Sequence, residues 1–324
     1  MPEHTVTLAH LSDVHLGPLP PIPWPLLNLK RATGWFNWHR TRKTVHLPET
    51  ADRIAKDVAA QQPTHIAVGG DMANLGLPAE IERSAVWLRR LGAAADVSVV
   101  PGNHDIYARS GGRTLGIDAL VPWRAYFTAD AEGQKYAGAS AFPFVRVVAR
   151  GRTRVALIGL NSAVETAPGI ATGRLGAEQR ADLARILRET LRDGLVRVVM
   201  LHHPPLPGGA TPHHALTDAA DLADILRTCG AELVLHGHNH QRSVTPFDGP
   251  DGTFAIVGVP SASVGRNAPK GEPLARAHYF NIRSDGDAPA HIELVARGLA
   301  EPDGPIIELE RTRLDRPSLA RRSL

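Results

Sequence analysis

Short apolar runs of strand length alternate along the chain with longer stretches of helical periodicity. This alternation predicts parallel strands joined by crossover helices, and therefore an α/β fold. Towards the carboxyl end, four apolar runs follow one another without a helical stretch between them, and they predict antiparallel strands. The expected strands span residues 5–11, 65–69, 97–100, 154–160, 196–201, 233–235, 254–259, 277–282, 292–295 and 306–309, and the expected helices span 49–61, 79–91, 177–192 and 219–228.

Three stretches fall outside this alternation. Residues 17–48 interrupt the first step from strand to helix, residues 106–116 form a loop with glycines and arginines, and residues 311–324 form a tail rich in arginine. No internal repeat divides the chain. We therefore expect a single domain over residues 1–310, with 17–48 as an inserted cap segment and 311–324 as a basic C-terminal tail.

Five of the predicted strands are each followed immediately by side chains that can bind a metal. Open α/β sheets place ligand sites beyond the carboxyl ends of their strands, so we expect these side chains to meet at one rim. Residues two apart in a strand face the same way, which would bring together Asp13 with His15 and His238 with His240. Carboxylates, imidazoles and amide oxygens suit Mn, Fe, Zn or Co, whereas the lack of a thiolate argues against a structural zinc site. The candidates are Asp13, His15, Asp71, Asn103, His104, Asp105, His202, His238 and His240.

These residues belong to five short motifs. The motifs are Asp-x-His at 13–15, Gly-Asp at 70–71, Gly-Asn-His-Asp at 102–105, a strand-end His at 202 and Gly-His-x-His at 237–240. Their order resembles that of the calcineurin-like metallophosphoesterase superfamily, in its bacterial phosphodiesterase branch. The resemblance covers residues 8–240, and it implies a four-layer α-β-β-α sandwich with two divalent metal ions, Mn being the first choice among Mn, Fe, Zn and Co.

The resemblance also implies a part for each residue. One metal would be bound by Asp13, His15 and His240, the other by Asn103, His202 and His238, and Asp71 would bridge both. His203 is the alternative to His202. Two metals about 3.5–4 Å apart make hydroxide available near neutral pH from a bridging water. That hydroxide would attack phosphorus, His104 would donate a proton to the leaving oxygen, and Asp105 would orient His104.

The sequence departs from the motifs of two sub-families, and this limits the reactions that we expect. Purple acid phosphatases would have a tyrosine where this chain has Asn74, and Ser/Thr protein phosphatases would have a glutamate where it has Asp105. The motifs look most like bacterial phosphodiesterases. We expect a phosphodiesterase of a small-molecule or lipid phosphodiester, most specifically a lipid- or glycerol-linked one. The alternatives are a cyclic nucleotide phosphodiesterase, then a nuclease, and last a non-catalytic binding module.

The cap segment, residues 17–48, is the most individual part of the chain. Its early prolines favour an extended, stiff start. It contains Trp24, Trp35 and Trp38 together with five basic residues, and no acidic residue. This composition suits the surface of an anionic membrane and resembles the insertion of metallophosphoesterases that act on lipids. The alternatives are a cap packed on the body of the protein and a contact between subunits.

Composition limits the partners and the location. The net charge of +3 is too small to predict a nucleic-acid partner. The single cysteine, Cys229, excludes an intrachain disulfide and fits a reducing compartment. No signal-peptide pattern opens the chain, and no apolar run reaches the ~18 residues of a membrane helix. The expected location is therefore the cytoplasm, with peripheral contact at the inner membrane face left open, and the oligomeric state is not predicted.

Two segments are expected to form walls of the site. The cap segment follows His15 and the loop 106–116 follows Asp105, and Arg109 and Arg113 of that loop are candidates for a phosphate contact. The remaining histidines are interpreted as structural, namely His4, His10, His39, His46, His65, His213, His214, His236, His278 and His291.

Overall fold

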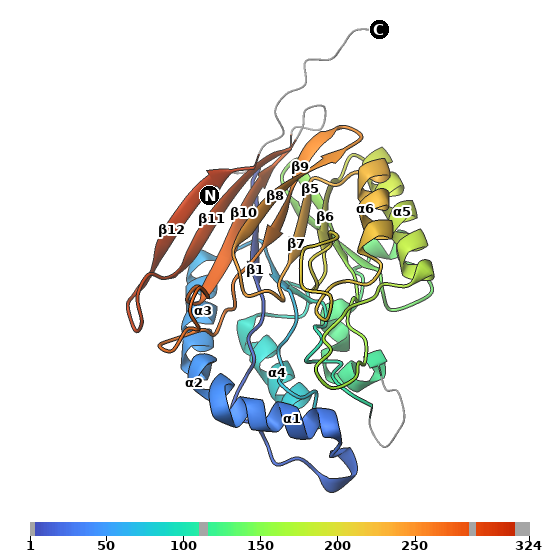
Figure 1. Cartoon of the computed structure of the whole chain (residues 1–324). Helices are drawn as coiled ribbons and strands as arrows, with labels where there is room; N and C mark the ends of the chain where they lie inside the picture. Colours follow the sequence, from blue (N-terminus) through green and yellow to red (C-terminus); the bar gives the residue numbers. More distant parts are fainter. Residues whose placement is uncertain (1–3, 110–115, 285–289, 315–324) are drawn as a thin grey trace, which may run out of the picture.

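The computed structural model describes residues 4–109, 116–284 and 290–314. Two six-stranded sheets lie face to face, with helices on their outer sides (Figure 1). The first sheet has the order β12-β11-β10-β1-β2-β3, and the second has the order β4-β5-β6-β7-β9-β8. The predicted α/β sandwich of four layers is therefore confirmed.

Each sheet combines parallel and antiparallel strands. The first sheet consists of β1 (Val6–Leu11), β2 (His65–Val68), β3 (Val97–Val99), β10 (Arg276–Arg283), β11 (His291–Leu299) and β12 (Ile306–Arg313). The second consists of β4 (Phe144–Arg150), β5 (Thr153–Gly159), β6 (Val196–Met200), β7 (Leu233–His236), β8 (Ser243–Gly249) and β9 (Gly252–Gly258). The helices are α1 (Leu29–Asn37), α2 (Lys43–Val45), α3 (Pro48–Gln61), α4 (Pro78–Leu91), α5 (Ala177–Arg192) and α6 (Ala219–Cys229). Short 3₁₀ segments span Trp24–Leu26, Gly116–Phe127 and Gly133–Lys135, and a π-helical turn spans Trp38–Arg42.

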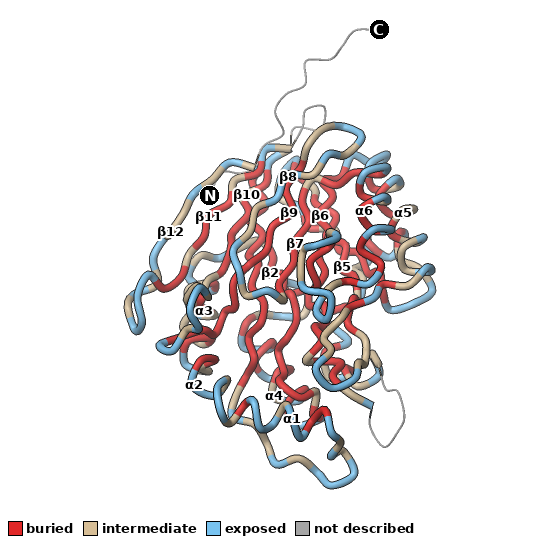
Figure 2. Tube along the Cα trace, viewed as in Figure 1, coloured by how far each residue is buried: buried red, intermediate tan, exposed pale blue. Residues whose placement is uncertain are grey.

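The central strands of the second sheet are buried on both faces. In β5, Val155 and Leu157 belong to the core between the sheets, whereas Ala156 and Ile158 pack in a second core with α5 and α6. Alternate residues of a strand face opposite sides, so double burial requires apolar residues at consecutive positions. The strands accordingly form the buried centre of the molecule in Figure 2.

Two edge strands were not predicted. β4 and β8 pair antiparallel at the two edges of the second sheet. β8 is largely half-buried or exposed and contains Pro246 and Gly249, so it has no apolar run. The prediction that residues 254–259 form an antiparallel strand holds only on one side, because β9 pairs antiparallel with β8 but parallel with β7.

The cap segment starts extended and then becomes helical. α1 begins after Asn28, whose side chain accepts a hydrogen bond from Arg31 N and so caps the helix. α1, the π-helical turn and α2 then follow one another to Val45. In Figure 1, α1 and α2 lie at the lower end of the molecule. Among the helices of the described residues, none combines the length and the apolar character needed to cross a bilayer.

Candidate metal centre

Seven of the candidate residues lie together at one rim, where strands of both sheets end. They are Asp13 and His15 after β1, Asp71 after β2, Asn103 after β3, His202 after β6, and His238 and His240 after β7. Five of them are buried, and the last two are half-buried. Backbone hydrogen bonds of 2.9 Å join the first two loops, from Asp13 N to Gly70 O and from His15 N to Asp71 O.

The backbone at this rim adopts an unfavourable conformation. In the described parts of the chain, seven non-glycine residues have positive φ, and five of these belong to the rim: Asp13, His15, Asp71, His238 and His240. Such residues cost energy and concentrate at functional sites. Asp13 and His15 do converge as expected, whereas His238 and His240 belong to different groups, and neither pair lies within a strand. Each strand has already ended, and left-handed turns aim the side chains instead.

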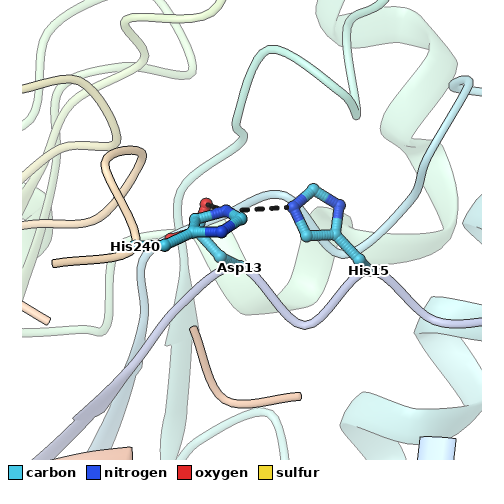
Figure 3. Close-up of side chains that lie close together, drawn as sticks. All are labelled: Asp13, His15 and His240. Carbon is cyan, nitrogen blue, oxygen red and sulfur yellow. Dashed lines mark hydrogen bonds and ion pairs between the residues drawn. The ribbon is translucent and has the colours of Figure 1, made fainter. Parts of the chain in front are cut away.

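Asp13, His15 and His240 form a first group of converging atoms (Figure 3). The Nε2 atoms of His15 and His240 lie 3.4 Å apart, and His240 Nε2 lies 3.3 Å from Asp13 Oδ1. The other ring nitrogens are engaged, because His15 Nδ1 donates to Ala73 O at 3.1 Å and His240 Nδ1 lies 2.6 Å from Glu272 Oε1. Both rings thus turn Nε2 towards one centre, as metal-binding imidazoles do.

The other four residues form a second group beside the first. His238 Nδ1 lies 2.9 Å from Asn103 Oδ1 and 3.3 Å from His202 Nε2. His202 Nδ1 donates to a backbone carbonyl at 2.7 Å, which leaves Nε2 to face the centre. Asp71 Oδ2 lies 3.4 Å from His202 Nε2 and 3.8 Å from His15 Nε2, so it stands between the two groups.

The charges of the two groups suit cations. Burial acts to raise the pKa of Asp13, but His240 outweighs this effect and lowers the pKa to about 2. Burial acts to lower the pKa values of His202 and His240. Asp71 and Asp13 nevertheless raise that of His202 to about 9, and Asp13 and Glu272 raise that of His240 to about 9. Protons on the two imidazoles thus balance the carboxylates. A divalent cation would balance the same charges and displace those protons, so the donor atoms fit a metal.

His104 lies beside the two groups as a neutral ring. Its Nδ1 lies 2.5 Å from Asn74 O, and its Nε2 lies 2.9 Å from Arg42 Nη1. A carbonyl only accepts and a guanidinium only donates, so Nδ1 carries the proton and Nε2 carries the lone pair. Burial and the charge of Arg42 lower the pKa of His104 to about 3. The ring must therefore gain a proton before it can act as the predicted acid.

The prediction that Asp105 orients His104 is wrong. The buried Asp105 carboxylate accepts hydrogen bonds of 2.8 Å from the backbone amides of Asp71, Ala73 and Gly102. Three convergent amides satisfy both carboxylate oxygens, and a carbonyl oxygen holds His104 instead. Asp105 therefore joins the loops after β2 and β3.

His203, the alternative to His202, has no free ring nitrogen. Its Nδ1 lies 2.8 Å from Ser162 Oγ and its Nε2 lies 3.1 Å from Ala171 O. Both partners lie in the segment after β5, so His203 holds this segment although its ring lies 4.5 Å from that of His238. The geometry therefore favours His202 at the centre.

Further residues at the site were not predicted. His214, interpreted as structural, lines the pocket beside the site, and its ring lies 5.8 Å from that of His238. The ring of His46 lies 4.5 Å from that of His15 and 5.3 Å from that of His240, so its interpretation as merely structural misses this position. Glu272 holds His240, and Arg42 holds His104. The basic character of the cap segment was the only signal for Arg42. Nothing in the sequence marks His46 or Glu272, because both reach the rim from segments between regular elements.

A pocket of about 590 Å³ opens beside the two groups. The cap segment lines it with Lys30, Asn37 and Arg42, in keeping with its predicted place as a wall of the site. The opposite lining includes the loops at 169–171 and 210–214. The cap segment and the metal-site residues therefore line the same pocket.

Only residues 106–109 and 116 of the loop 106–116 are among the described residues. Tyr107 lines the pocket. Arg109 does not line it, and its side chain is exposed and lies 3.9 Å from Glu165. Arg113 lies outside the described residues.

A two-sheet sandwich with Asp, His and Asn side chains gathered at one strand-end rim is the arrangement of a metal-dependent phosphoric ester hydrolase. The family model of calcineurin-like phosphoesterases matches residues 6–242, and the chain belongs to this family. Its metal dependence follows from the family, which leaves the identity of the metal open.

Curated relatives and solved structures agree with this placement. A probable cyclic nucleotide phosphodiesterase of Synechococcus sp. (strain ATCC 27144 / PCC 6301 / SAUG 1402/1) is 26% identical over 299 residues, which are 86% of this chain and 94% of that protein. Another, of Synechococcus sp. (strain WH7803), is 35% identical over 112 residues, which are 34% of this chain and 42% of that protein.

Two solved structures share the fold. A dimetal phosphatase from Danio rerio has a TM-score of 0.61 at 13% identity, over 97% of this chain and 100% of that one. The purple acid phosphatase PPD1 from yellow lupin (Lupinus luteus) seeds has a TM-score of 0.54 at 12% identity, over 97% of this chain and 54% of that one. At these identities the likeness concerns the fold alone.

Proposed function

We propose that this protein is a phosphodiesterase with a binuclear metal centre, acting on a lipid- or glycerol-linked phosphodiester. The observation that carries the proposal is the clustering of the seven rim residues. Ligand atoms of Asp13, His15 and His240 converge, ligand atoms of Asp13, Asp71 and His202 converge beside them, and Asp71 Oδ2 lies 3.8 Å from His15 Nε2 and 3.4 Å from His202 Nε2. The first group, Asp13, His15 and His240, would bind one ion, and Asn103, His202 and His238 would bind the other, with Asp71 on both. Mn is the first choice of metal, and Fe, Zn and Co are the alternatives.

The bound ions would supply a hydroxide nucleophile near neutral pH and offset negative charge on the phosphate. His104 and Arg42 line the pocket and meet at His104 Nε2. That contact holds His104, a group that can transfer a proton, at the pocket wall, where a leaving oxygen would need one. We therefore keep His104 as the candidate proton donor. Asp105 supports the site because it joins the loops after β2 and β3, which carry Asp71 and Asn103.

The lipid-linked substrate is supported by α1, because this helix buries charged residues and exposes apolar ones. Lys30 and Arg31 are buried against the body, where they donate to backbone carbonyls. Leu29 and Phe36 face outward and are 70% and 60% exposed, and Trp24 just before the helix is 86% exposed. A surface helix normally buries its apolar face. The reversal favours contact of this face with an apolar medium.

The charge around this apolar face favours an anionic lipid surface. The cap segment has no acidic residue, and its Arg40 and Lys43 are exposed near α1. Trp38 is buried, so it supports the cap and does not belong to the face. We propose that the protein is cytoplasmic and docks peripherally on the inner face of the membrane.

A cyclic nucleotide phosphodiesterase is the second candidate. The relatives from Synechococcus carry that activity in their names. A pocket of about 590 Å³ is also large enough for a small ligand. A panel of cyclic nucleotides, glycerophosphodiesters, phospholipids and UDP-linked acyl sugars separates the two. A higher kcat/KM for a cyclic nucleotide than for every lipid or glycerol ester would reverse our ranking.

Metal-dependent hydrolysis is the first test. The protein should hydrolyse bis(p-nitrophenyl) phosphate when Mn, Fe, Zn or Co is supplied. Asp71→Asn removes the charge shared by both groups and should lower kcat by about a hundredfold or more. Asp52→Asn is the matched control, because Asp52 lies on α3 and pairs with Arg90 outside the rim. Absence of hydrolysis with all four metals would contradict the proposed function.

A further inference from the structure

Two cations of the cap segment, Lys30 and Arg42, line the same pocket as the metal-site residues. Lys30 belongs to the first turn of α1 and is only 6% exposed. Its Nζ donates to Tyr107 O at 2.8 Å and to Thr166 Oγ1 at 2.6 Å. Arg42 ends the π-helical turn and donates to His104 Nε2 at 2.9 Å. Both side chains are thus held at the pocket wall.

A pair of rings fixes these cations relative to the metal site. The Tyr107 and His104 rings stack at 5.3 Å with an angle of 22°. Lys30 Nζ lies 4.4 Å from the centre of the Tyr107 ring, and Arg42 contacts the His104 ring. The backbone N of His104 donates to Asp71 Oδ1 at 2.7 Å. A continuous series of contacts therefore runs from Lys30 to Arg42 and on to the carboxylate between the two groups.

In the part of the chain that the structure describes, no carboxylate pairs with either cation. Their partners are carbonyl and hydroxyl oxygens and an imidazole. The acidic residues that line the pocket are Asp71, which belongs to the metal site, and Glu272, which holds His240. Burial lowers the pKa of Lys30 to about 8, although the charges of Asp71 and Glu165 act to raise it, and a bound anion would act in the same direction as these carboxylates. A buried cation without a carboxylate is suited to an anion from solution.

We propose that Lys30 and Arg42 form an anion subsite that binds a second negatively charged group of the substrate, beside the scissile phosphate. This inference rests on the proposed function. A simple phosphodiester carries one negative charge and would leave one of the two cations unbalanced. The substrate would therefore be a phosphodiester that also carries a phosphate or a carboxylate. A glycerophosphodiester with an acidic head group and a nucleoside diphosphate ester both have this chemistry.

Binding of inorganic pyrophosphate tests the subsite without turnover. Calorimetry on the full chain, freed of metal by chelation, should show binding that Arg42→Gln and Lys30→Met each weaken about tenfold, the loss of one charge-assisted contact. Arg42→Lys should retain part of the affinity. Lys43→Gln is the control, because Lys43 is exposed and does not line the pocket. Equal affinity in wild type, Arg42→Gln and Lys43→Gln would overturn the proposal, even if Lys30→Met fails to fold.

Kinetics then separate this subsite from the proposed function. Arg42→Gln should lower kcat/KM about tenfold more, mainly through KM, for a p-nitrophenyl diester that carries a carboxylate than for bis(p-nitrophenyl) phosphate. Equal losses would overturn the subsite alone. Glycerophosphoserine and ADP-ribose, tested as inhibitors, distinguish the two sources of the second charge, and inhibition by neither would also overturn it. Pyrophosphate binding without any diester hydrolysis would refute the proposed function and leave the anion site standing.

Discussion

Gly102 shows how closely the backbone packs around the metal-site residues. A Cβ at this position would lie 2.1 Å from Asp71 Oδ1 and 2.5 Å from Asp71 N. Gly102→Ala should therefore displace Asp71, lower the stability by about 1–3 kcal/mol and reduce the bound metal. Gly17→Ala is the control, since the nearest atom to its Cβ is 3.5 Å away. Thermal unfolding and metal analysis measure both effects, and normal metal content in Gly102→Ala would contradict the position of Asp71.

At the same scale, the role of His104 as proton donor can be tested by comparing two esters with different leaving groups. A glycerol oxygen needs a proton as it leaves, whereas p-nitrophenolate leaves without one. His104→Ala should therefore slow a glycerol ester by about 10²- to 10⁴-fold and a p-nitrophenyl ester much less. Metal content should stay near that of wild type, and the exposed His213→Ala should change neither rate. Equal slowing of both esters would show that His104 supports the site and donates no proton.

At the scale of elements, burial on both faces made the central strands predictable. Strands such as β5 are buried on both faces, so their apolar runs are visible in the sequence. The edge strand β8 is half-buried or exposed and was missed, and the edge strand β4 was missed although most of its residues are buried. The rim residues could be found because they directly follow strands, whereas His46 and Glu272 reach the rim only through tertiary packing. The polarity of α1 could not be predicted, since its charged residues point inward.

The exposed face of α1 gives a prediction for the cap segment. Trp24, Leu29 and Phe36 are exposed, whereas Trp38 is buried. Trp24→Ser with Phe36→Ser should therefore abolish binding to vesicles of anionic phospholipid in a sedimentation assay, with little change in thermal stability. Val121→Ser is the control, because Val121 is 56% exposed outside the cap segment. Absence of wild-type binding, or unchanged binding by the double variant, would refute membrane contact through this face.

At the scale of the whole molecule, the site depends on both sheets. β1, β2 and β3 of the first sheet and β6 and β7 of the second deliver its residues. The sequence predicts each strand, but the facing of the two sheets was implied only by the family resemblance. Because neither sheet carries all seven residues, a metal bound between them should stabilise the packed molecule.

The first sheet also makes stability depend on pH. Burial lowers the pKa values of His65 and His278 to about 3, whereas both groups ordinarily titrate near 6.5. Between these pH values the unfolded chain binds protons that the folded chain does not. The free energy of unfolding should therefore fall as the pH drops below 6.5, by up to about 1.4 kcal/mol per pH unit for each histidine, and their contribution should be constant above it. Urea unfolding with chelator from pH 7.5 to 5 measures this slope. His65→Gln and His278→Gln should each reduce this slope, and an unchanged slope in both variants would contradict the prediction.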